Sequence, residues 1–254
     1  MSVQVALTGL SFLVSSQQRE VLHFSEKTFD TLASPEDIAL ALSEELNSQL
    51  AYTENIQEVT LIHSSPYYTI VPKVLFVADK ASEYLKFNTK ILSNDFVAHD
   101  TLEGHAIEVV YLPFVNINNL LFDTFGSFSY YHASTLFLKY VLNNEKHAQE
   151  AKAYIRVSED FFDMIVVKNG KLLLCNNYHY KSPEDFIYFT LFCLEQLQLN
   201  PNSIKTLLCG VIDENSTLYH MLYTYVRHVS FLEATLLSHM DKAPHEHFIL
   251  KTVL

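Results

Sequence analysis

The tetrapeptide Ser-Pro-Glu-Asp occurs twice in this 254-residue chain, within SPEDIALALSEEL at residues 34–46 and within SPEDFIYFTLFCLEQLQ at residues 182–198. Serine is suited to the N-cap of a helix, and proline to the first helical position, where its missing N–H costs nothing. The two acids that follow face the positive end of the helix dipole. Each copy therefore predicts the start of a helix.

Apolar residues recur every four positions after both motifs, as in an amphipathic helix. They are Ile38, Leu42, Leu46 and Leu50 in the first copy, and Phe186, Phe189, Cys193 and Leu197 in the second. Because no charged residue occurs from Phe186 to Leu194, we expect the second helix to be covered on most sides. Short apolar runs at 59–62 and 207–209 both begin 24 residues after the proline of their motif. The matched spacing indicates an internal repeat.

Strand-like runs also precede each motif. In the second copy they are residues 154–158, 161–167 and 172–176, and Asn169-Gly170 between the last two is a strong type I′ hairpin signal. In the first copy, runs at 3–15 and 21–24 flank a weaker turn at 16–18. Each half therefore predicts antiparallel strands, a crossover helix and a further strand of the same sheet.

The rest of the chain predicts an α/β protein with two lobes. Between the copies we expect a helix near 78–87, strands at 95–97 and 106–112, a helix from Asn116 to Gly126, a strand at 127–131 and a helix through 136–142. After Asp213 we expect a helix at 218–226, a strand at 229–232 and a terminal helix that includes 248–254. The longest fully polar stretch, NNEKHAQE at 143–150, is the predicted boundary between a first lobe, residues 1–147, and a second lobe, residues 148–254.

This pattern resembles the superfamily of actin, heat-shock cognate ATPases and sugar kinases, whose two lobes each hold a ribonuclease H-like mixed sheet. Residues 153 to about 232 carry most of the resemblance, through AYIRVSEDFFDMIVVKNGKLLLCNNYHY, the second helix and IKTLLCGVID. The first half matches through QVALTGLSFLVSS, EVTLIHSS and YYTIVPKVLF. The whole chain looks like a bacterial family of unknown function with an actin-like ATPase fold. It is similar, more distantly, to actin-like assembly proteins of type IV pilus and type II secretion machines.

The resemblance implies a nucleotide site with an Asp-x-Gly turn between the first two strands of each lobe. There, backbone N–H groups bind phosphate and a carboxylate positions the metal. The first lobe has Thr8-Gly9-Leu10-Ser11-Phe12, without an acid, and the second has residues 157–163, with three acids and no glycine. A glycine pair that the family carries after the next strand is reduced to Gly210, with Asp213 nearby. Neither turn matches a phosphate cradle.

The candidate nucleotide-binding residues are therefore Ser158, Asp160, Asp163, Gly210 and Asp213. In a second interpretation, which we favour, the acids tighten a turn and Gly210 relieves crowding at the end of a strand. No catalytic residue is assigned, and no metal or cofactor is expected. Magnesium and ATP enter only if this turn still binds nucleotide, with Asp163 or Asp160 for the metal and Gly210 near adenosine.

Two other clusters have a plainer interpretation. His245 and His247, with Asp241 and Glu246, form a metal-like group, but its position near the C-terminus favours a solvated tail. Tyr67-Tyr68 and Tyr130-Tyr131-His132 would line a cleft between the lobes if the duplication is real.

Composition excludes some classes of function. Only five glycines occur, and the formal charge is −12 with no run of lysine or arginine, so nucleic acid and anionic membranes are poor partners. The three cysteines, at 175, 193 and 209, lie among apolar neighbours without zinc spacing, which favours buried free thiols and a reducing compartment. The first basic residue follows the N-terminal apolar run, so we expect a strand there instead of a signal peptide. No run is long enough to span a membrane, and we expect a cytoplasmic protein.

Three hypotheses for function remain open. The first, which we favour, is a non-catalytic interaction or scaffold module with degenerate nucleotide-binding turns and an unknown protein partner. The second is a divergent Mg-ATP-binding ATPase or small-molecule kinase. The third is a subunit or partner of a membrane-associated assembly, without direct membrane insertion, which could also be a homo-oligomer.

Overall fold

The computed structural model describes residues 1–49, 56–92, 95–234, 240 and 242–253. Contacts within it group the chain into two compact units. The first is Met1–Leu136 with residues of the C-terminal segment, and the second begins at Phe137. No helix in the described ranges is long and apolar enough to cross a bilayer.

The first unit contains a five-stranded mixed sheet in the order β3-β2-β1-β4-β8. Its strands are β1 (Ser2–Ala6), β2 (Gly9–Ser15), β3 (Val21–Thr28), β4 (Thr60–His63) and β8 (Ser129–His132). The pairs β1–β2 and β2–β3 are antiparallel, whereas β4 lies parallel to both β1 and β8. Helices α1 (Pro35–Ser48) and α4 (Val115–Phe125) supply the apolar side chains that pack on one face of this sheet.

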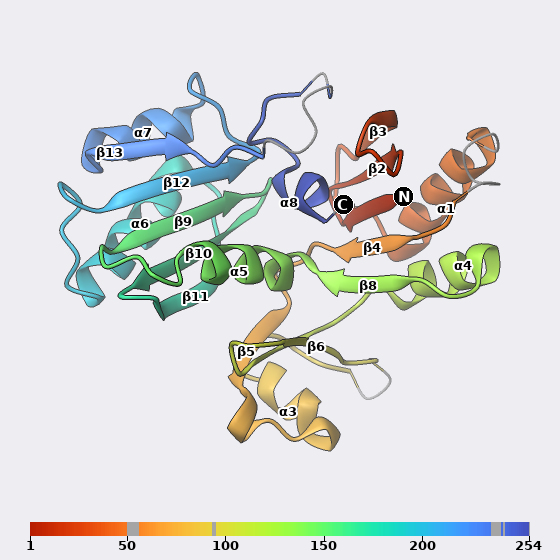
Figure 1. Cartoon of the computed structure of the whole chain (residues 1–254), viewed down its shortest axis with the longest axis horizontal. Coiled ribbons are helices and arrows are strands. Elements are labelled where there is room, and N and C mark those ends of the chain that lie inside the picture. The colour runs from red at the N-terminus through yellow and green to blue at the C-terminus, as the bar shows by residue number, and fades with distance from the viewer. Residues whose placement is uncertain (50–55, 93–94, 235–239, 241, 254) are drawn as a thin grey trace. The chain divides into compact units, whose positions relative to one another are not determined.

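The second unit repeats this arrangement, with the strand order β11-β10-β9-β12-β13 (Figure 1). Its strands are β9 (Lys152–Val157), β10 (Phe161–Lys168), β11 (Lys171–His179), β12 (Lys205–Gly210) and β13 (His228–Phe231), and its helices are α6 (Pro183–Gln196) and α7 (Thr217–Tyr225). Alternate residues of β9 and β10, among them Ile155 and Met164, face these helices and form the core. The predicted order of hairpin, crossover helix and parallel strand is confirmed in both units.

Both Ser-Pro-Glu-Asp motifs begin helices as predicted. Ser34 and Ser182 are N-caps whose side chains accept hydrogen bonds from the backbone N–H of Asp37 and Asp185. Each aspartate in turn accepts from the backbone N–H of its serine, which completes a capping box. The apolar period places Ile38, Leu42 and Leu46 in the core, while Leu50 lies outside the described residues.

The predicted hairpin turn at Asn169-Gly170 is also confirmed. Both residues have positive φ, 52° and 67°, as a type I′ turn requires. A Cβ on Gly170 would also lie 2.6 Å from the carbonyl oxygen of Lys146, so glycine is needed for space as well as for conformation.

A third sheet, which the sequence did not reveal as such, is inserted between β4 and α4. It has the order β5-β7-β6 and consists of antiparallel strands β5 (Tyr68–Pro72), β6 (Ala98–Leu102) and β7 (Ile107–Tyr111). Between β5 and β6 come the short 3₁₀ turns η1 (Lys73–Leu75) and η2 (Ala78–Lys80), and helix α3 (Ala81–Leu85). The predicted strand at 95–97 is wrong, because these residues pair with no strand in the described ranges and β6 begins only at Ala98.

One prediction from polarity is wrong. Helix α6 is not covered on most sides, since Tyr188 and Phe192 are 60% and 45% exposed and stack on each other. The polar stretch 143–150 contains a buried group, the carboxylate of Glu145, which accepts from Lys152 and from the Tyr154 hydroxyl. In both places local polarity does not record which residues the rest of the fold covers.

Two further helices complete the described chain, α5 (Ala133–Asn144) and α8 (Phe248–Thr252). The division between the two compact units falls within α5, between Leu136 and Phe137. None of the three cysteines forms a disulfide; Cys193 and Cys209 are buried as expected, and Cys175 is half-buried.

Replacing Ser182 by alanine removes the N-cap of α6 and should lower the free energy of unfolding by about 1 kcal/mol, measured by urea titration followed by circular dichroism. Ser182→Asp keeps an oxygen acceptor at the cap and should retain most of the stability. Equal losses in the two variants would contradict the assigned capping role.

Candidate functional site

The predicted site residues of the second unit lie at one edge of its sheet. Strands β9 and β12 are parallel, so the turn after Val157 and the loop after Gly210 leave the sheet at the same end. Ser158 and Asp160 lie in that turn, and Gly210 and Asp213 lie at the end of β12 and in its loop. The fold thus brings these four residues to the same sheet edge, while Asp163 lies within β10.

Asp163 is not a free carboxylate at that edge. It is fully buried and forms an ion pair with Arg156, its cross-strand partner on β9. On the other side of β9, Arg156 pairs with Cys209 of β12. Burial raises the pKa of the Cys209 thiol to about 12. A carboxylate neutralised by a guanidinium in this way is poorly suited to receive a magnesium ion.

Gly210 is required by a close approach of the backbone. Its φ is +94°, and a Cβ at this position would lie 2.1 Å from the carbonyl oxygen of Val157. The same carbonyl accepts a hydrogen bond of 2.9 Å from the N–H of Val211. This geometry matches the interpretation in which Gly210 relieves crowding at a strand end.

The other candidate side chains stabilise turns. The carboxylate of Asp213 accepts from the N–H of Asn215 at 2.7 Å, and its carbonyl accepts from Ser216, the N-cap of α7. Asp160 is half-buried, with its carboxylate 4.0 Å from the ring of His179. The carbonyl of Ser158 accepts from the hydroxyl of Tyr180 at 2.5 Å.

His245 does not lie in a solvated tail. It is buried, stacks on Phe231 at 4.1 Å between ring centroids and donates from Nε2 to the carbonyl of Ile212 at 2.7 Å. Its own carbonyl accepts from Gly210. The prediction of a solvated tail is therefore wrong for His245, because the segment folds back on the loop that follows β12. Asp241 lies outside the described residues, and the described part of the chain contains no group of three or more metal-ligating side chains.

The first unit has an equivalent edge with different chemistry. Val5 pairs with Leu10 and with His63, as Val157 pairs with Phe162 and with Gly210. The N–H of Ser64 donates to Val5 at 2.8 Å, the counterpart of the bond from Val211 to Val157.

These registers give three residues of the second unit a counterpart in the first. Ser11 occupies the position of Asp163, Gln4 that of Arg156, and His63 that of Gly210. The first unit therefore has neither an acid nor a glycine at those positions. The carbonyls of its turn, at Leu7 and Thr8, accept from the N–H groups of Ala33 and Phe29.

His63 was not singled out from the sequence. It is buried at the end of β4, accepts at Nδ1 from the N–H of Phe114 and donates from Nε2 to Asn118. Burial lowers the pKa of His63 to about 4, so the ring is neutral near pH 7. A histidine that ends an apolar strand, as in TLIHSS, was the only signal in the sequence.

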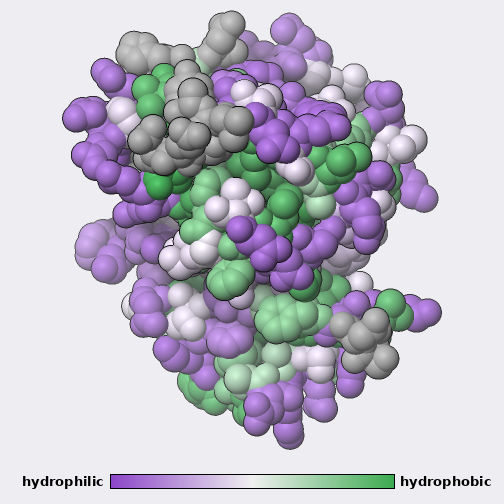
Figure 2. Space-filling view, turned by 90° about the vertical axis from the view of Figure 1, so that its right-hand side faces the viewer, coloured by the Kyte–Doolittle hydropathy of each residue, from purple (hydrophilic) through white to green (hydrophobic). Residues whose placement is uncertain are grey.

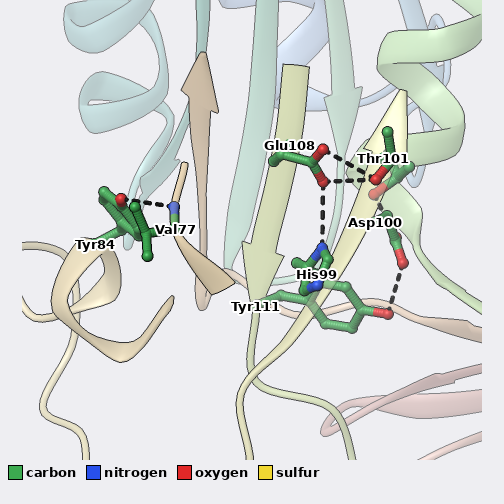
Figure 3. Close-up of polar contacts among 8 residues, drawn as sticks. Val77, Tyr84, His99, Asp100, Thr101, Glu108 and Tyr111 are labelled. Atoms are coloured by element: carbon green, nitrogen blue, oxygen red, sulfur yellow. Dashed lines mark hydrogen bonds and ion pairs between the residues drawn. The ribbon is translucent and has the colours of Figure 1, made fainter. Parts of the chain in front are cut away.

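A buried polar network beside His63 was also missed. Asp100, on β6, accepts three hydrogen bonds, from the Tyr111 hydroxyl at 3.0 Å, the His132 N–H at 2.8 Å and the Thr135 hydroxyl at 2.6 Å (Figure 3 shows the bond to Tyr111). Burial raises the pKa of Asp100, and the hydrogen bonds act in the opposite direction. The network joins the inserted sheet to β8 and α5.

Two of the residues in the aromatic clusters are part of the interior of the first unit. Tyr68 and His132 are buried and in ring contact at 4.8 Å. The His132 ring accepts at Nδ1 from Ser134 and donates from Nε2 to the carbonyl of Ser65 at 3.1 Å. Both ring nitrogens of His132 are hydrogen-bonded within the protein, which indicates a structural role for this side chain.

Gly210→Ala should destabilise the protein by more than the roughly 1–2 kcal/mol expected for a left-handed residue alone, because the Cβ would also clash with Val157. Gly104→Ala is the matched control: Gly104 has φ +84°, and its Cβ would meet nothing within 4 Å. Urea unfolding of both variants measures the difference. Equal costs would show that the close approach does not matter.

Asp163→Asn should lower the free energy of unfolding by about 3–5 kcal/mol, because it leaves the buried Arg156 without its counter-charge. Asp160→Asn, at a half-buried position whose carboxylate is 4.0 Å from His179, should stay within about 0.5 kcal/mol of the unmodified protein. An Asp163→Asn protein that is as stable as the unmodified chain would contradict the assigned ion pair.

Comparisons with known proteins agree with this fold. The family model described as "Protein of unknown function (DUF3822)" matches residues 1–229. No curated protein matches the chain. A Bacteroides thetaiotaomicron protein with an actin-like ATPase fold and unknown function is similar, with a TM-score of 0.79 and 22% identity over 91% of this chain and 89% of that one.

More distant structures cover nearly the whole chain. The PilM–PilN type IV pilus biogenesis complex matches with a TM-score of 0.56 and 11% identity, over 98% of this chain and 95% of that one. The cytoplasmic domain of EpsL, an inner membrane component of the type II secretion system of Vibrio cholerae, matches with a TM-score of 0.45 and 13% identity, over 99% and 92%. The two sheets of identical topology are those of an actin-like ATPase fold, and the chain belongs to the DUF3822 family of proteins of unknown function.

Proposed function

We propose that this protein is a non-catalytic scaffold with an actin-like fold that binds a protein partner. The observation that carries the proposal is which residue stands just after the first turn of each unit, where the fold resemblance implies a metal ligand. At equivalent positions the first unit has Ser11, and the second has Asp163 in a buried ion pair with Arg156. Neither turn offers a free carboxylate at the position where the fold resemblance implies a metal.

The space for a phosphate is also reduced in both units. In the second, the carbonyl of Val157 occupies the room beside Gly210. In the first, the turn bonds to the segment that enters α1, through Phe29 and Ala33. Because phosphate binding needs N–H groups directed at open space, these contacts favour a structural role for both turns.

A role in assembly is consistent with one relative. PilM, which shares this fold at a TM-score of 0.56, is described in a complex with PilN that serves type IV pilus biogenesis. By analogy we propose that this chain also acts by binding another protein, as a subunit or partner of a larger assembly. Association with a second copy remains part of this proposal.

One observation favours a second candidate, a divergent Mg-ATP-binding ATPase or kinase. Ser158, Asp160, Gly210 and Asp213 all lie at the sheet edge where β9 and β12 end, with Asp213 exposed and Asp160 half-buried. In this candidate Asp160 and Asp213 would face the metal and the ribose. The first proposal remains better supported, because Asp160 has no glycine beside it in its turn.

Thermal unfolding with Mg-ATP separates the two candidates. A nucleotide bound with a Kd one hundredth of its concentration would stabilise the folded state by about 2.7 kcal/mol. For a chain of this length that corresponds to a rise in Tm of about 5–11 °C. We expect no shift at millimolar Mg-ATP relative to magnesium alone, and no ATP turnover. A shift or turnover that Asp160→Asn or Asp213→Asn abolishes would overturn the scaffold proposal.

A further inference from the structure

The end of the inserted sheet carries an exposed apolar surface that the proposed function does not use. Val74, Leu75 and Phe87 are 86%, 64% and 91% exposed. Figure 2 shows hydrophobic side chains between hydrophilic ones at the lower end of the molecule, where Figure 1 places α3. We call residues 73–90 the α3 tip. Val74 and Leu75 are adjacent in the chain, and large apolar side chains exposed to this degree mark an interaction surface where they form a patch.

The α3 tip is held in shape by a hydrogen-bonded tyrosine. The hydroxyl of Tyr84, on α3, donates to the carbonyl of Leu75 at 2.6 Å and accepts from the N–H of Val77 at 3.1 Å (Figure 3). The ring of Phe76 packs against Tyr84 and His99, at 5.8 and 4.7 Å. The segment that exposes Val74 and Leu75 is thereby fixed to the helix that leads to Phe87. Such preorganisation lowers the entropic cost of binding.

The charge of this surface is opposite to that of the whole chain. Four lysines and two acids lie between residues 73 and 90, a net charge of +2 in a chain of net charge −12. The lysines are Lys73, Lys80, Lys86 and Lys90, all exposed, and none forms an ion pair with any residue in the described ranges. A sequence scan for basic runs misses them because they are seven, six and four positions apart.

We propose that the α3 tip docks on an anionic membrane surface, with Val74, Leu75 and Phe87 entering the headgroup boundary and the four lysines contacting acidic headgroups. Lipid fits better than protein, because lysine is depleted in protein interfaces and this stretch has no arginine. Exposed apolar side chains flanked by lysines are what a bilayer interface accommodates. The negative charge elsewhere is screened beyond about 8 Å at physiological ionic strength.

Flotation with lipid vesicles tests the proposal on the full, tag-free chain. The protein should float with vesicles of phosphatidylcholine and phosphatidylglycerol, much less with phosphatidylcholine alone, and less as salt is raised. Leu75→Ser should weaken binding about tenfold, and Lys86→Gln about fivefold. Both residues are exposed, so the variants should fold, which thermal unfolding verifies.

Matched variants elsewhere on the surface provide the controls. Leu40→Ser replaces a leucine that is 62% exposed on α1, and Lys171→Gln replaces an exposed lysine on β11, so neither should change vesicle binding. Failure to bind the mixed vesicles, or equal effects of Leu75→Ser and Leu40→Ser, would overturn the proposal. So would a dimer, seen by light scattering, that Leu75→Ser dissociates. Because none of these outcomes involves ATP, they are independent of the scaffold proposal.

Discussion

The parallel pairing of the first and fourth strand of each sheet is the constraint on which the structure depends. It places β4 beside β1 and β12 beside β9, after a helix that crosses back over the sheet. Each pairing ends in the same backbone bond, from Ser64 to Val5 and from Val211 to Val157. This bond brings the loop after the fourth strand against the hairpin turn after the first. Every candidate site residue of the second unit except Asp163 lies at or beside that junction.

The two junctions satisfy this constraint with different residues. In the second unit the close approach leaves no room for a side chain, so Gly210 is used. In the first unit the equivalent position holds His63, whose ring nitrogens bond to Phe114 and Asn118. The same backbone pairing therefore holds Gly210 at the end of β12 and a buried, neutral His63 at the end of β4. Similar topology therefore does not guarantee that the two edges have similar chemistry.

Two buried aspartates, Asp163 and Asp100, are stabilised by different kinds of partner. Asp163 is balanced by a cation, Arg156, whereas Asp100 is balanced by three neutral or backbone donors. In an ion pair, a second buried charge offsets the cost of removing the carboxylate from water. In a hydrogen-bond network, neutral donors offset the same cost without a second charge. The hydrogen bonds of Asp100 connect the inserted sheet, through Tyr111, with β8, through His132, and with α5, through Thr135. Asp100 therefore fixes the inserted sheet to β8 and α5.

The sequence by itself determined the features whose causes lie within a few residues. These include both helix starts, the Asn169-Gly170 turn, the order of strands in each repeat and the end of α4 at Gly126. Capping boxes and type I′ turns depend on residues at most four positions apart, so their signals are readable in the chain.

Tertiary structure decided what contacts each residue from a distance. It alone buried Asp163 against Arg156, Glu145 against Tyr154 and His245 against Phe231, and left Tyr188 and Phe87 exposed. The physical reason is that burial and local charge are set by residues far apart in the chain, which composition and periodicity do not record.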